Sequence, residues 1–425
     1  MTGVAGVDDA QAPEIRQVGV IGGGQLAWMM LGAAQKLGLE LVLQTPLATD
    51  PAIANSLQAG LNEAVNAVLA PIADAEATAR LAQQCQVITF ENEFVDLPAL
   101  RQLEVQGVCF RPRLSVLASL LDKHEQRQFL QSLDLPVPPF AAITPQDDPR
   151  SLGFEFPMVV KARRHGYDGQ GTFILKDAVE LEQFWQQFQQ QELQAQNLQE
   201  QNLQAPELQA QEPNLNHRFM VEAFVPFERE LAIMAARAET GEVALYPVIE
   251  TQQKKQVCRW AIAPAPISPA IQTQVEAIAT TLLASLEAVG IFGIELFLTA
   301  AGEVLVNEIA PRTHNSGHLT IEACSTSQFE QQLRAVAGLP LGDTALQTPA
   351  AVMVNLLGFE TAHANYQDQR DRLGEIPGAT VHWYGKAESK LGRKLGHVTV
   401  LLDHPNHAAA VAIAQQVEAL WYPSL

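Results

Sequence analysis

Residues 303–318 place a dense group of polar side chains directly after a strand pattern. They read Glu303-Val304-Leu305-Val306-Asn307-Glu308-Ile309-Ala310-Pro311-Arg312-Thr313-His314-Asn315-Ser316-Gly317-His318. The apolar run at 304–306 is typical of a buried β-strand, and open α/β sheets place their active sites where such strands end. Glu308 can bind a hard cation, and Arg312 can hold a doubly charged oxyanion with its fork of donors. We therefore expect an α/β fold with an active site here, rather than a polar loop without a task.

A second carboxylate lies on the strand pattern that precedes this one. Gly293-Ile294-Glu295-Leu296-Phe297-Leu298 predicts a strand, and the turn Thr299-Ala300-Ala301-Gly302 joins it to Val304–Asn307. In such a hairpin Glu295 and Glu308 can face each other, and with Asn307 they form a Mg²⁺ site of the kind that works through ATP phosphates. Either glutamate alone is also consistent with an ordinary surface residue, so the prediction rests on the pair.

The middle of the chain carries a lysine inside an apolar strand pattern, Met158-Val159-Val160-Lys161-Ala162. A lysine in such a strand is costly unless it meets an anion. Gly166-Tyr167-Asp168-Gly169-Gln170-Gly171-Thr172 follows, and its backbone amides could close over a polyphosphate. This flap lacks the Walker pattern, but a lysine strand that leads into it favours ATP. The alternative is a structural hairpin without a ligand.

The N-terminal region reads as strand, glycine turn and helix. The pieces are Val18-Gly19-Val20-Ile21, then Gly22-Gly23-Gly24-Gln25-Leu26-Ala27, then the helical pattern Trp28–Leu37. This predicts a doubly wound half-domain. A dinucleotide site would also need an acid after the second strand, but Leu39–Leu43 ends in Gln44-Thr45-Pro46. A third strand, Gln86–Phe90, runs into Glu91-Asn92-Glu93. The glycine turn therefore either binds a monophosphate or only permits tight packing.

Composition limits the class of protein. A chain of 425 residues, 47% of them apolar, should hold two or three globular domains. It has no apolar run that could cross a bilayer, and Asp8 and Asp9 do not fit a secretory signal. Four scattered cysteines suit a reducing, cytoplasmic location. A net charge of −20 disfavours nucleic acid as a partner, so an anionic substrate would need a local cluster of cations.

A low-complexity tract rich in Gln, Leu, Glu and Ala spans about residues 186–214. Its composition cannot bury much apolar surface. We expect a solvated insertion, as a helix extension or a surface loop, in preference to a coiled-coil partner site.

With these pieces assembled, the chain resembles the ATP-grasp ligases, and more closely the 5-(carboxyamino)imidazole ribonucleotide synthetases of purine biosynthesis. The resemblance runs from Val18 to about Tyr422. Its most specific parts are Lys161 with the 166–171 flap, the run Asn307–Arg312 with His314–His318, and His382-Trp383-Tyr384-Gly385-Lys386 with Gly392-Arg393-Lys394-Leu395-Gly396-His397.

The resemblance implies an ATP-grasp fold in three domains. Residues 1–121 would form the doubly wound parallel-sheet domain, 122–343 the ATP-grasp domain, whose lid carries the flap and the Gln-rich insertion, and 344–425 a small β-rich domain. It implies ATP-dependent carboxylation of aminoimidazole ribonucleotide with bicarbonate through carboxyphosphate, with Mg²⁺ as cofactor. It also implies a cytoplasmic homodimer that binds neither nucleic acid nor membrane.

The resemblance also assigns roles to individual residues. The catalytic group would be Lys161, Arg312, His314 and Asn315, and Mg²⁺ would be held by Glu295 and Glu308. ATP would be bound by Lys123, Lys161, Gly166, Tyr167, Asp168, Gly169, Gln170, Gly171, Thr172, Glu222, Ala223, Phe224, Val225, Glu230, Gln253, Asn307 and Glu308. The ribonucleotide would be bound by Gly24, Gln25, Leu26, Glu91, Glu93, Tyr167, Asp168, Lys386, Arg393 and Lys394. Two positions depart from the family pattern, since Gln253 replaces a usual histidine and Trp28 a frequent arginine.

Three alternatives stay open at this point. One is another ATP-grasp ligase, such as a formate-dependent glycinamide ribonucleotide formyltransferase. The others are an NAD-dependent oxidoreductase that uses the glycine turn and a non-catalytic nucleotide-binding protein. The missing ribose acid disfavours the oxidoreductase, and the intact Glu295/Glu308 pair disfavours loss of catalysis.

Overall fold

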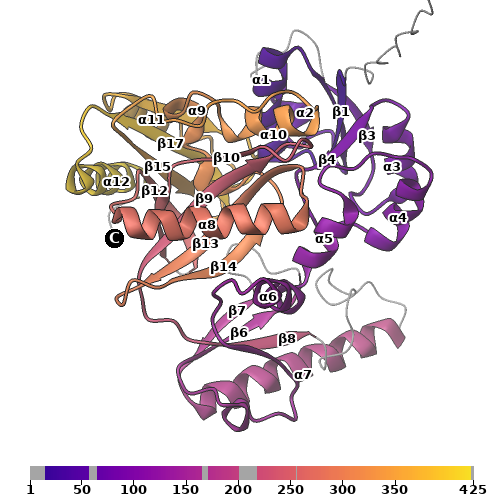
Figure 1. Ribbon diagram of the computed structural model, residues 1–425, viewed down its shortest axis with the longest axis vertical. Coiled ribbons are helices and arrows are strands. Elements are labelled where there is room, and N and C mark those ends of the chain that lie inside the picture. Colours follow the sequence, from indigo (N-terminus) through magenta and orange to yellow (C-terminus); the bar gives the residue numbers. More distant parts are fainter. Residues whose placement is uncertain (1–14, 57–64, 165–170, 201–217, 255, 423–425) are drawn as a thin grey trace, which may run out of the picture.

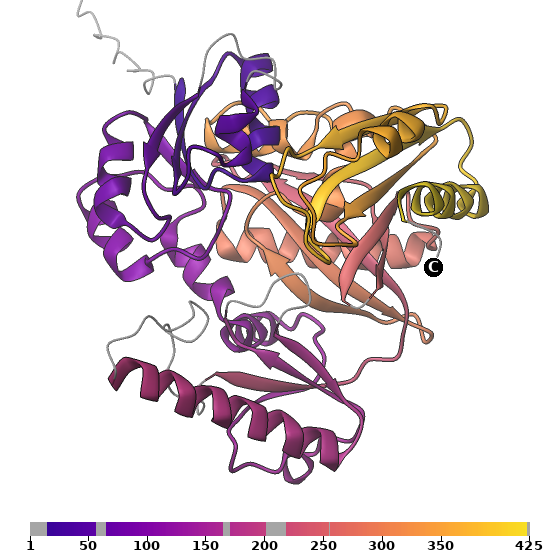
Figure 2. The same cartoon turned by 180° about the vertical axis from the view of Figure 1, so that it is seen from behind.

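The computed structural model describes residues 15–56, 65–164, 171–200, 218–254 and 256–422. Three β-sheets organise these residues, with the N-terminal sheet and the C-terminal strands above and a smaller sheet below (Figures 1 and 2). In the described part of the chain, no helix has the length and hydropathy that a membrane span requires.

The N-terminal sheet is parallel and has the strand order β3-β2-β1-β4. Its strands are β1 (Gln17–Ile21), β2 (Glu40–Thr45), β3 (Asn66–Leu69) and β4 (Val87–Phe90). Helix α1 (Gln25–Leu37) covers one face, while α3 (Ala75–Ala82), α4 (Leu97–Val105) and α5 (Leu114–Leu121) cover the other; the short α2 (Pro51–Ala54) packs on α1. The predicted doubly wound domain is confirmed, although β3 was not predicted.

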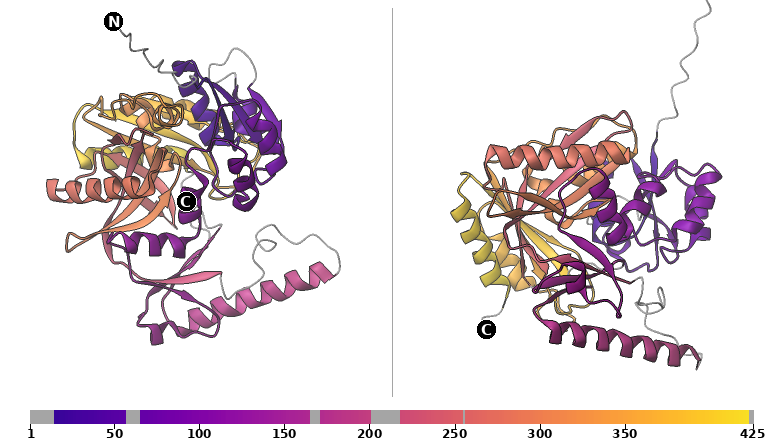
Figure 3. Two further views of the ribbon diagram at one scale, coloured as in Figure 1. Left: turned by 45° about the vertical axis from the view of Figure 1, so that its right-hand side comes forward. Right: turned by 60° about the horizontal axis from the view of Figure 1, so that its bottom comes forward.

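The smaller sheet, called the lid sheet below, is antiparallel with the order β5-β8-β6-β7. It contains β5 (Phe140–Ile143), β6 (Met158–Ala162), β7 (Thr172–Leu175) and β8 (Phe219–Ala223). The short helix η2 (Pro149–Leu152) lies in the connection between β5 and β6. Helix α7 (Ala178–Glu200) packs on it through Phe184, Trp185 and Phe188 and then projects beyond it (Figures 1 and 3). Helix α6 (Lys123–Ser132) lies between this sheet and the rest of the molecule (Figure 1).

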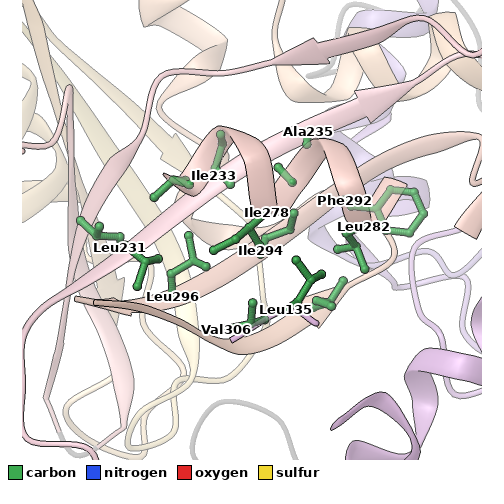
Figure 4. Close-up of a cluster of buried hydrophobic side chains, with 14 of the residues drawn as sticks. Leu135, Leu231, Ile233, Ala235, Ile278, Leu282, Phe292, Ile294, Leu296 and Val306 are labelled. Carbon is green, nitrogen blue, oxygen red and sulfur yellow. The ribbon is translucent and has the colours of Figure 1, made fainter. Parts of the chain in front are cut away.

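The large sheet has the order β14-β13-β9-β11-β12-β15-β17-β16, with β10 on the side of β9. Its first part contains β9 (Phe227–Arg237), β10 (Val243–Leu245), β11 (Ile249–Lys254), β12 (Val257–Ala263), β13 (Gly290–Thr299) and β14 (Val304–Ala310). Helix α8 (Pro269–Leu286) covers this part, where Ile278 and Leu282 pack against Ile233, Phe292 and Ile294 (Figure 4).

The C-terminal strands extend this same sheet rather than forming a separate one. Strand β15 (Ala350–Leu357) pairs with β12, then β17 (Lys394–Leu402) and β16 (Ala379–Trp383) follow. Helices α11 (Gln367–Gly374) and α12 (His407–Trp421) cover one face. Strand pairing thus crosses the proposed 343/344 boundary, and the division into three domains remains a proposal.

The segment between β14 and β15 contains the short helices η4 (Asn315–Gly317) and α9 (Thr320–Ala323) and then α10 (Gln328–Val336). Helix α10 packs on α1 through Phe329 and Leu333, and thereby joins the N-terminal sheet to the large sheet.

The apolar run Tyr246-Pro247-Val248-Ile249 has a sequence pattern that predicts a strand, and the prediction is wrong for its first three residues. Tyr246-Pro247-Val248 connects β10 to β11 and is not itself a strand. Pro247 cannot donate to a ladder, and the Tyr246 hydroxyl instead donates to the carbonyl of Thr326 at 3.0 Å.

Candidate active site

The two predicted metal ligands lie directly opposite each other. Glu295 on β13 is the register partner of Glu308 on β14, next to a bulge in the ladder. Asn307 Nδ2 donates to Glu295 Oε2 at 3.3 Å, and Glu308 forms an ion pair with Lys123. The sequence therefore predicted this hairpin correctly.

The charges in this hairpin fit a divalent cation. Burial, with Glu308 close by, raises the pKa of Glu295 to about 7. Burial alone would also raise the pKa of Glu308, but the Lys123 ammonium lowers it below its usual range. A divalent cation between the two carboxylates would relieve the repulsion between Glu295 and Glu308. Within the described residues no group of three or more His, Cys, Asp or Glu side chains is placed to hold a metal. A Mg²⁺ ion takes one or two carboxylates and completes its shell with phosphates.

The predicted ribose ligand Glu230 adjoins this pair. It lies on β9 opposite Phe297 of β13, and burial, with the charge of Glu295, raises its pKa to about 7. The backbone N–H of Gln253 donates to Glu230. Two of the predicted ATP residues that are far apart in the chain are thus in contact.

A buried ion cluster links the lid sheet to the large sheet. Lys161 Nζ on β6 lies 2.7 Å from Glu222 Oε2 on β8 and 3.1 Å from Asn307 Oδ1 on β14. Arg127 on α6 donates to Glu222 Oε1 at 2.6 Å and to the Asn307 carbonyl at 2.5 Å. Burial would raise the pKa of Glu222, but the charges of Arg127 and Lys161 lower it to about 2. The predicted lysine does meet an anion, and that anion is Glu222.

Sequence reasoning missed Arg127, although a signal for it was present. Arg127 lies four residues after Lys123 on α6, so the two cations share one face of the helix.

Ala223, Phe224 and Val225 follow Glu222 at the end of β8, where Phe224 is partly exposed.

The flap between β6 and β7 lies largely outside the described residues. This applies to the predicted positions Gly166, Tyr167, Asp168, Gly169 and Gln170. The two flap residues that are described sit beside the lysine strand: the Gly171 carbonyl accepts from Ala162 N at 2.6 Å, and Thr172 is the register partner of Lys161.

The predicted phosphoryl-transfer residues follow β14. Arg312 forms two hydrogen bonds with Glu93, and its Nη1 donates to the Thr313 carbonyl at 3.1 Å. His314 Nε2 lies 3.5 Å from Glu295 Oε1, while its Nδ1 lies 2.8 Å from Ser316 Oγ. Its ring packs over Gly293, where a Cβ atom would come within 2.4 Å of the His314 Cβ.

The glycine turn binds a carboxyl group, and in this structure that group is the side chain of Glu91. Glu91 accepts hydrogen bonds from the backbone N–H groups of Gly24 at 3.0 Å and Leu26 at 3.2 Å, at the N-terminus of α1. A Cβ atom at Gly24 would lie 2.4 Å from Glu91 Oε1. The turn therefore permits close packing of a carboxylate against a helix N-terminus.

One of the three predicted C-terminal cations reaches this turn. Lys386 Nζ donates to Gln25 Oε1 at 2.9 Å. Arg393 is exposed and donates to the Glu388 carbonyl at 2.9 Å, and Lys394 is the first residue of β17. The structure thus joins Lys386 to the N-terminal half of the predicted ribonucleotide site.

Comparison with known proteins covers all three parts of the chain. Residues 15–119 match the ribonucleotide synthetase preATP-grasp domain, residues 128–329 the ATP-grasp domain and residues 351–411 the phosphoribosylaminoimidazole carboxylase C-terminal domain. The sequence is 51% identical over 415 residues to the N5-carboxyaminoimidazole ribonucleotide synthase of Synechococcus elongatus, with 96% of each chain covered.

Solved structures agree with this comparison. The N5-carboxyaminoimidazole ribonucleotide synthetase of Thermotoga maritima is 36% identical, with a TM-score of 0.77 and with 95% of this chain and 98% of that chain covered. The N5-carboxyaminoimidazole synthase of Aspergillus clavatus, in complex with ADP and 5-aminoimidazole ribonucleotide, is 27% identical, with a TM-score of 0.79 and the same coverage of 95% and 98%. The ATP-grasp fold predicted from the sequence is therefore confirmed.

Proposed function

The chain belongs to the family of N5-carboxyaminoimidazole ribonucleotide synthases, and from this premise we propose how its residues divide the work of the reaction. The reaction is the ATP-dependent carboxylation of 5-aminoimidazole ribonucleotide with bicarbonate. It gives 5-(carboxyamino)imidazole ribonucleotide, ADP and phosphate in purine (IMP) biosynthesis. The observation that carries this conclusion is the 51% identity to the Synechococcus synthase over 96% of both chains.

Lys161 and Lys123 hold the ATP phosphates. Each already faces an anion from another element, Glu222 and Glu308 respectively. Lys161 has more than one donor, so it can keep Glu222 and still contact a phosphate oxygen. The flap from Gly166 to Thr172 closes over the phosphates, and Glu230 takes the ribose hydroxyls near Gln253.

Glu295 and Glu308 would hold Mg²⁺, and the ion would supply positive charge to the transferred phosphoryl group. The ligand charges fit this ion, because burial and the nearby charge of Glu308 raise the pKa of Glu295 to about 7. Asn307 orients Glu295 through its carboxamide.

Arg312, His314 and Asn315 surround bicarbonate. Bicarbonate is a poor electrophile, and its oxygen attacks the terminal phosphorus of ATP to give carboxyphosphate and ADP. Carboxyphosphate then delivers its carboxyl carbon to the amine and releases phosphate. The chain contributes position and charge to these steps, and a closed flap keeps water from the labile intermediate.

The ribonucleotide lies between the glycine turn and the C-terminal cations. Gln25 and Lys386 are already in contact across this site, and Arg393 and Lys394 provide the phosphate clamp that a chain of net charge −20 needs. Glu91 and Glu93 face the same site from the end of β4, where Glu93 holds Arg312. Tyr167 and Asp168, which lie outside the described residues, are assigned to the ribonucleotide by the family resemblance alone.

We also propose a cytoplasmic homodimer. All four cysteines are free thiols, which suits a reducing compartment. The dimer is proposed from the family resemblance and would be tested by light scattering.

Glycinamide ribonucleotide formyltransferase is the competing ATP-grasp activity. The C-terminal carboxylase domain match at 351–411 favours the bicarbonate enzyme. An oxidoreductase is disfavoured, because β2 ends in Thr45 rather than in an acid, and the nearby Asp50 carboxylate accepts a hydrogen bond from the Thr45 hydroxyl.

An assay of ADP release separates these activities. The purified chain is given ATP, Mg²⁺ and bicarbonate with aminoimidazole ribonucleotide, and in parallel glycinamide ribonucleotide with formate. ADP release that depends on the first pair supports the proposal, whereas release that depends on the second pair contradicts it.

A further inference from the structure

Three polar side chains form a row across the last three strands of the large sheet. Asn355 on β15 is the register partner of His397 on β17, and His397 is the register partner of His382 on β16. Directly opposed residues of antiparallel strands point to the same face. The row Asn355–His397–His382 therefore faces one side of the sheet, and two of its members are fully buried.

Each member of this row meets one residue of the segment that follows Arg312. Asn355 and Asn315 exchange hydrogen bonds between their carboxamides, at 2.9 and 2.7 Å. The rings of His397 and His318 lie 5.1 Å apart, and His382 Nε2 lies 2.6 Å from Glu322 Oε1. The segment 315–322 is thus docked on the sheet by two hydrogen-bonded pairs and one contact between imidazole rings.

The first pair fixes the orientation of Asn315. Asn355 uses one N–H on Asn315 Oδ1 and donates the other to the Cys258 carbonyl at 3.0 Å, while its oxygen accepts from Asn315 Nδ2. Asn355 therefore cannot rotate its carboxamide without losing several bonds. Because both side chains are buried, the lost bonds could not be replaced by water.

The middle of the row leads toward the ribonucleotide cations. His397 Nδ1 lies 2.8 Å from the hydroxyl of Tyr384, which is two residues from Lys386. Lys394 lies three residues before His397 on the same strand. Burial lowers the pKa of His397 and of His318 well below the usual range, so both rings are neutral and can pack together.

We propose that Asn355 is a positioning residue for the carboxylation reaction: it acts through Asn315 and keeps carboxyphosphate facing the ribonucleotide amine. The proposal rests on the role given above to Asn315. If Asn315 moves, carboxyphosphate meets water instead of the amine. Water then cleaves it to bicarbonate and phosphate, and the cycle turns ATP and water into ADP and phosphate without product.

The test compares Asn355→Leu with the parent chain and with a matched control. The substitution keeps the size of the side chain and removes its hydrogen bonds. Thr399→Val is the control, because Thr399 lies two residues from His397 on the same strand, is fully buried and has a hydroxyl without a hydrogen-bond partner. Product, ADP and the Michaelis constant for ATP are measured for each protein, together with thermal unfolding.

We expect Asn355→Leu to form product roughly tenfold more slowly. The loss of a buried hydrogen bond costs about as much free energy as a tenfold change in rate. The ratio of ADP to product should rise several-fold above the parent value, and the Michaelis constant for ATP should stay within about twofold. Thr399→Val should match the parent in all three quantities.

Other outcomes overturn the proposal. The proposal is wrong if Asn355→Leu forms product at a rate within twofold of the parent. It is also wrong if the rate falls while the ratio of ADP to product stays unchanged, because that result indicates a loss of active protein. The same rise in ratio for Thr399→Val would show a general disturbance of the sheet. If Asn355→Leu does not fold, Asn355→Asp, which keeps one acceptor for Asn315, takes its place, and failure of both to fold assigns Asn355 a structural role only. If the parent itself shows no release of ADP that depends on the ribonucleotide, the proposed function fails instead.

Discussion

Arg312 and Glu93, which lie 219 positions apart in the chain, form a two-point ion pair, with Nε–Oε2 at 2.5 Å and Nη2–Oε1 at 3.0 Å. The pair joins the segment after β14 to the end of β4. The proposed bicarbonate residue is thus held in place by a residue of the N-terminal domain, at the site proposed for the ribonucleotide.

Replacing Glu93 should therefore impair catalysis although Glu93 lies in a different domain. In Glu93→Ala the Arg312 fork loses two charge-assisted hydrogen bonds, worth about 1.5–3 kcal/mol in total for such contacts. We expect kcat/KM for bicarbonate to fall roughly ten- to a hundredfold. Steady-state kinetics check this, with Glu76→Ala on the exposed side of α3 as control. Equal kinetics for Glu93→Ala and the control would contradict the role given to the pair.

The carboxylate pair predicts a specific loss of metal binding. In Glu308→Gln the site loses one ligand charge, so turnover should fall by orders of magnitude while the fold persists. Mn²⁺ binding followed by electron paramagnetic resonance should weaken in parallel. The exposed Glu303→Gln, on the turn before β14, should leave both quantities unchanged. Near-normal ADP release by Glu308→Gln at ordinary Mg²⁺ would refute the assignment.

The buried Glu222 predicts a pH dependence of stability. Its pKa is lowered to about 2 in the folded chain, from an ordinary value near 4.5, so its ion pairs stabilise the fold above pH ~4.5 and this stabilisation is lost as the pH falls toward 2. The difference corresponds to a free energy on the order of 3 kcal/mol. Glu222→Gln should be clearly less stable than the parent at pH 7, and the gap should narrow as the pH is lowered. Urea unfolding at pH 7, 4 and 3 measures the gap, which would stay constant if Glu222 were not charged in the fold.

The Gln-rich tract predicts two different outcomes for two deletions. Phe188 lies inside the tract as the sequence delimits it, but it is buried against the lid sheet. Removing residues 193–214 should leave ATP turnover within a few-fold of the parent. A deletion that starts at 186 also removes Phe188, and we expect it to lower the melting temperature and the turnover. A loss of activity in the shorter deletion would show that the tract serves the lid.

The C-terminal cations predict a selective effect on one substrate. Arg393→Ala would remove the proposed arginine–phosphate contact, for which about 1.5–3 kcal/mol is typical. The Michaelis constant for aminoimidazole ribonucleotide should therefore rise roughly ten- to a hundredfold. The constant for ATP should hardly change. Arg393→Lys separates charge from fork geometry, and it should recover part of the loss. A shift in the ATP constant would place the phosphate clamp elsewhere.

Local patterns predicted much of the site. The strand at 158–162, the Glu295/Glu308 hairpin and the glycine turn before α1 all follow from periodicity and turn residues over fewer than twenty positions. Each of these elements is determined by residues that are close together in the sequence, and the structure contains all three.

What the sequence did not predict depends on contacts between distant segments. Nothing in the sequence near Asn355 marks it as the hydrogen-bond partner of Asn315. The resemblance assigned Glu91 to the ribonucleotide and did not predict that its side chain accepts hydrogen bonds from the glycine turn. Arg127 carried a local signal through its spacing from Lys123, but its anion, Glu222, lies 95 positions away. Such pairings are decided by tertiary packing.

The pairing of β12 with β15 also has a consequence for how the protein is made. Strand β12 ends at Ala263 and its neighbour begins at Ala350, so a nascent chain carries β12 with a bare edge while the intervening residues are synthesised. Among the described residues, Trp260 and Ile262 belong to a core cluster whose other members lie from Val352 onward. An unpaired apolar edge invites association with other chains. The strands of the large sheet therefore leave the ribosome in two groups, and between them the edge of β12 lacks the partner strand β15.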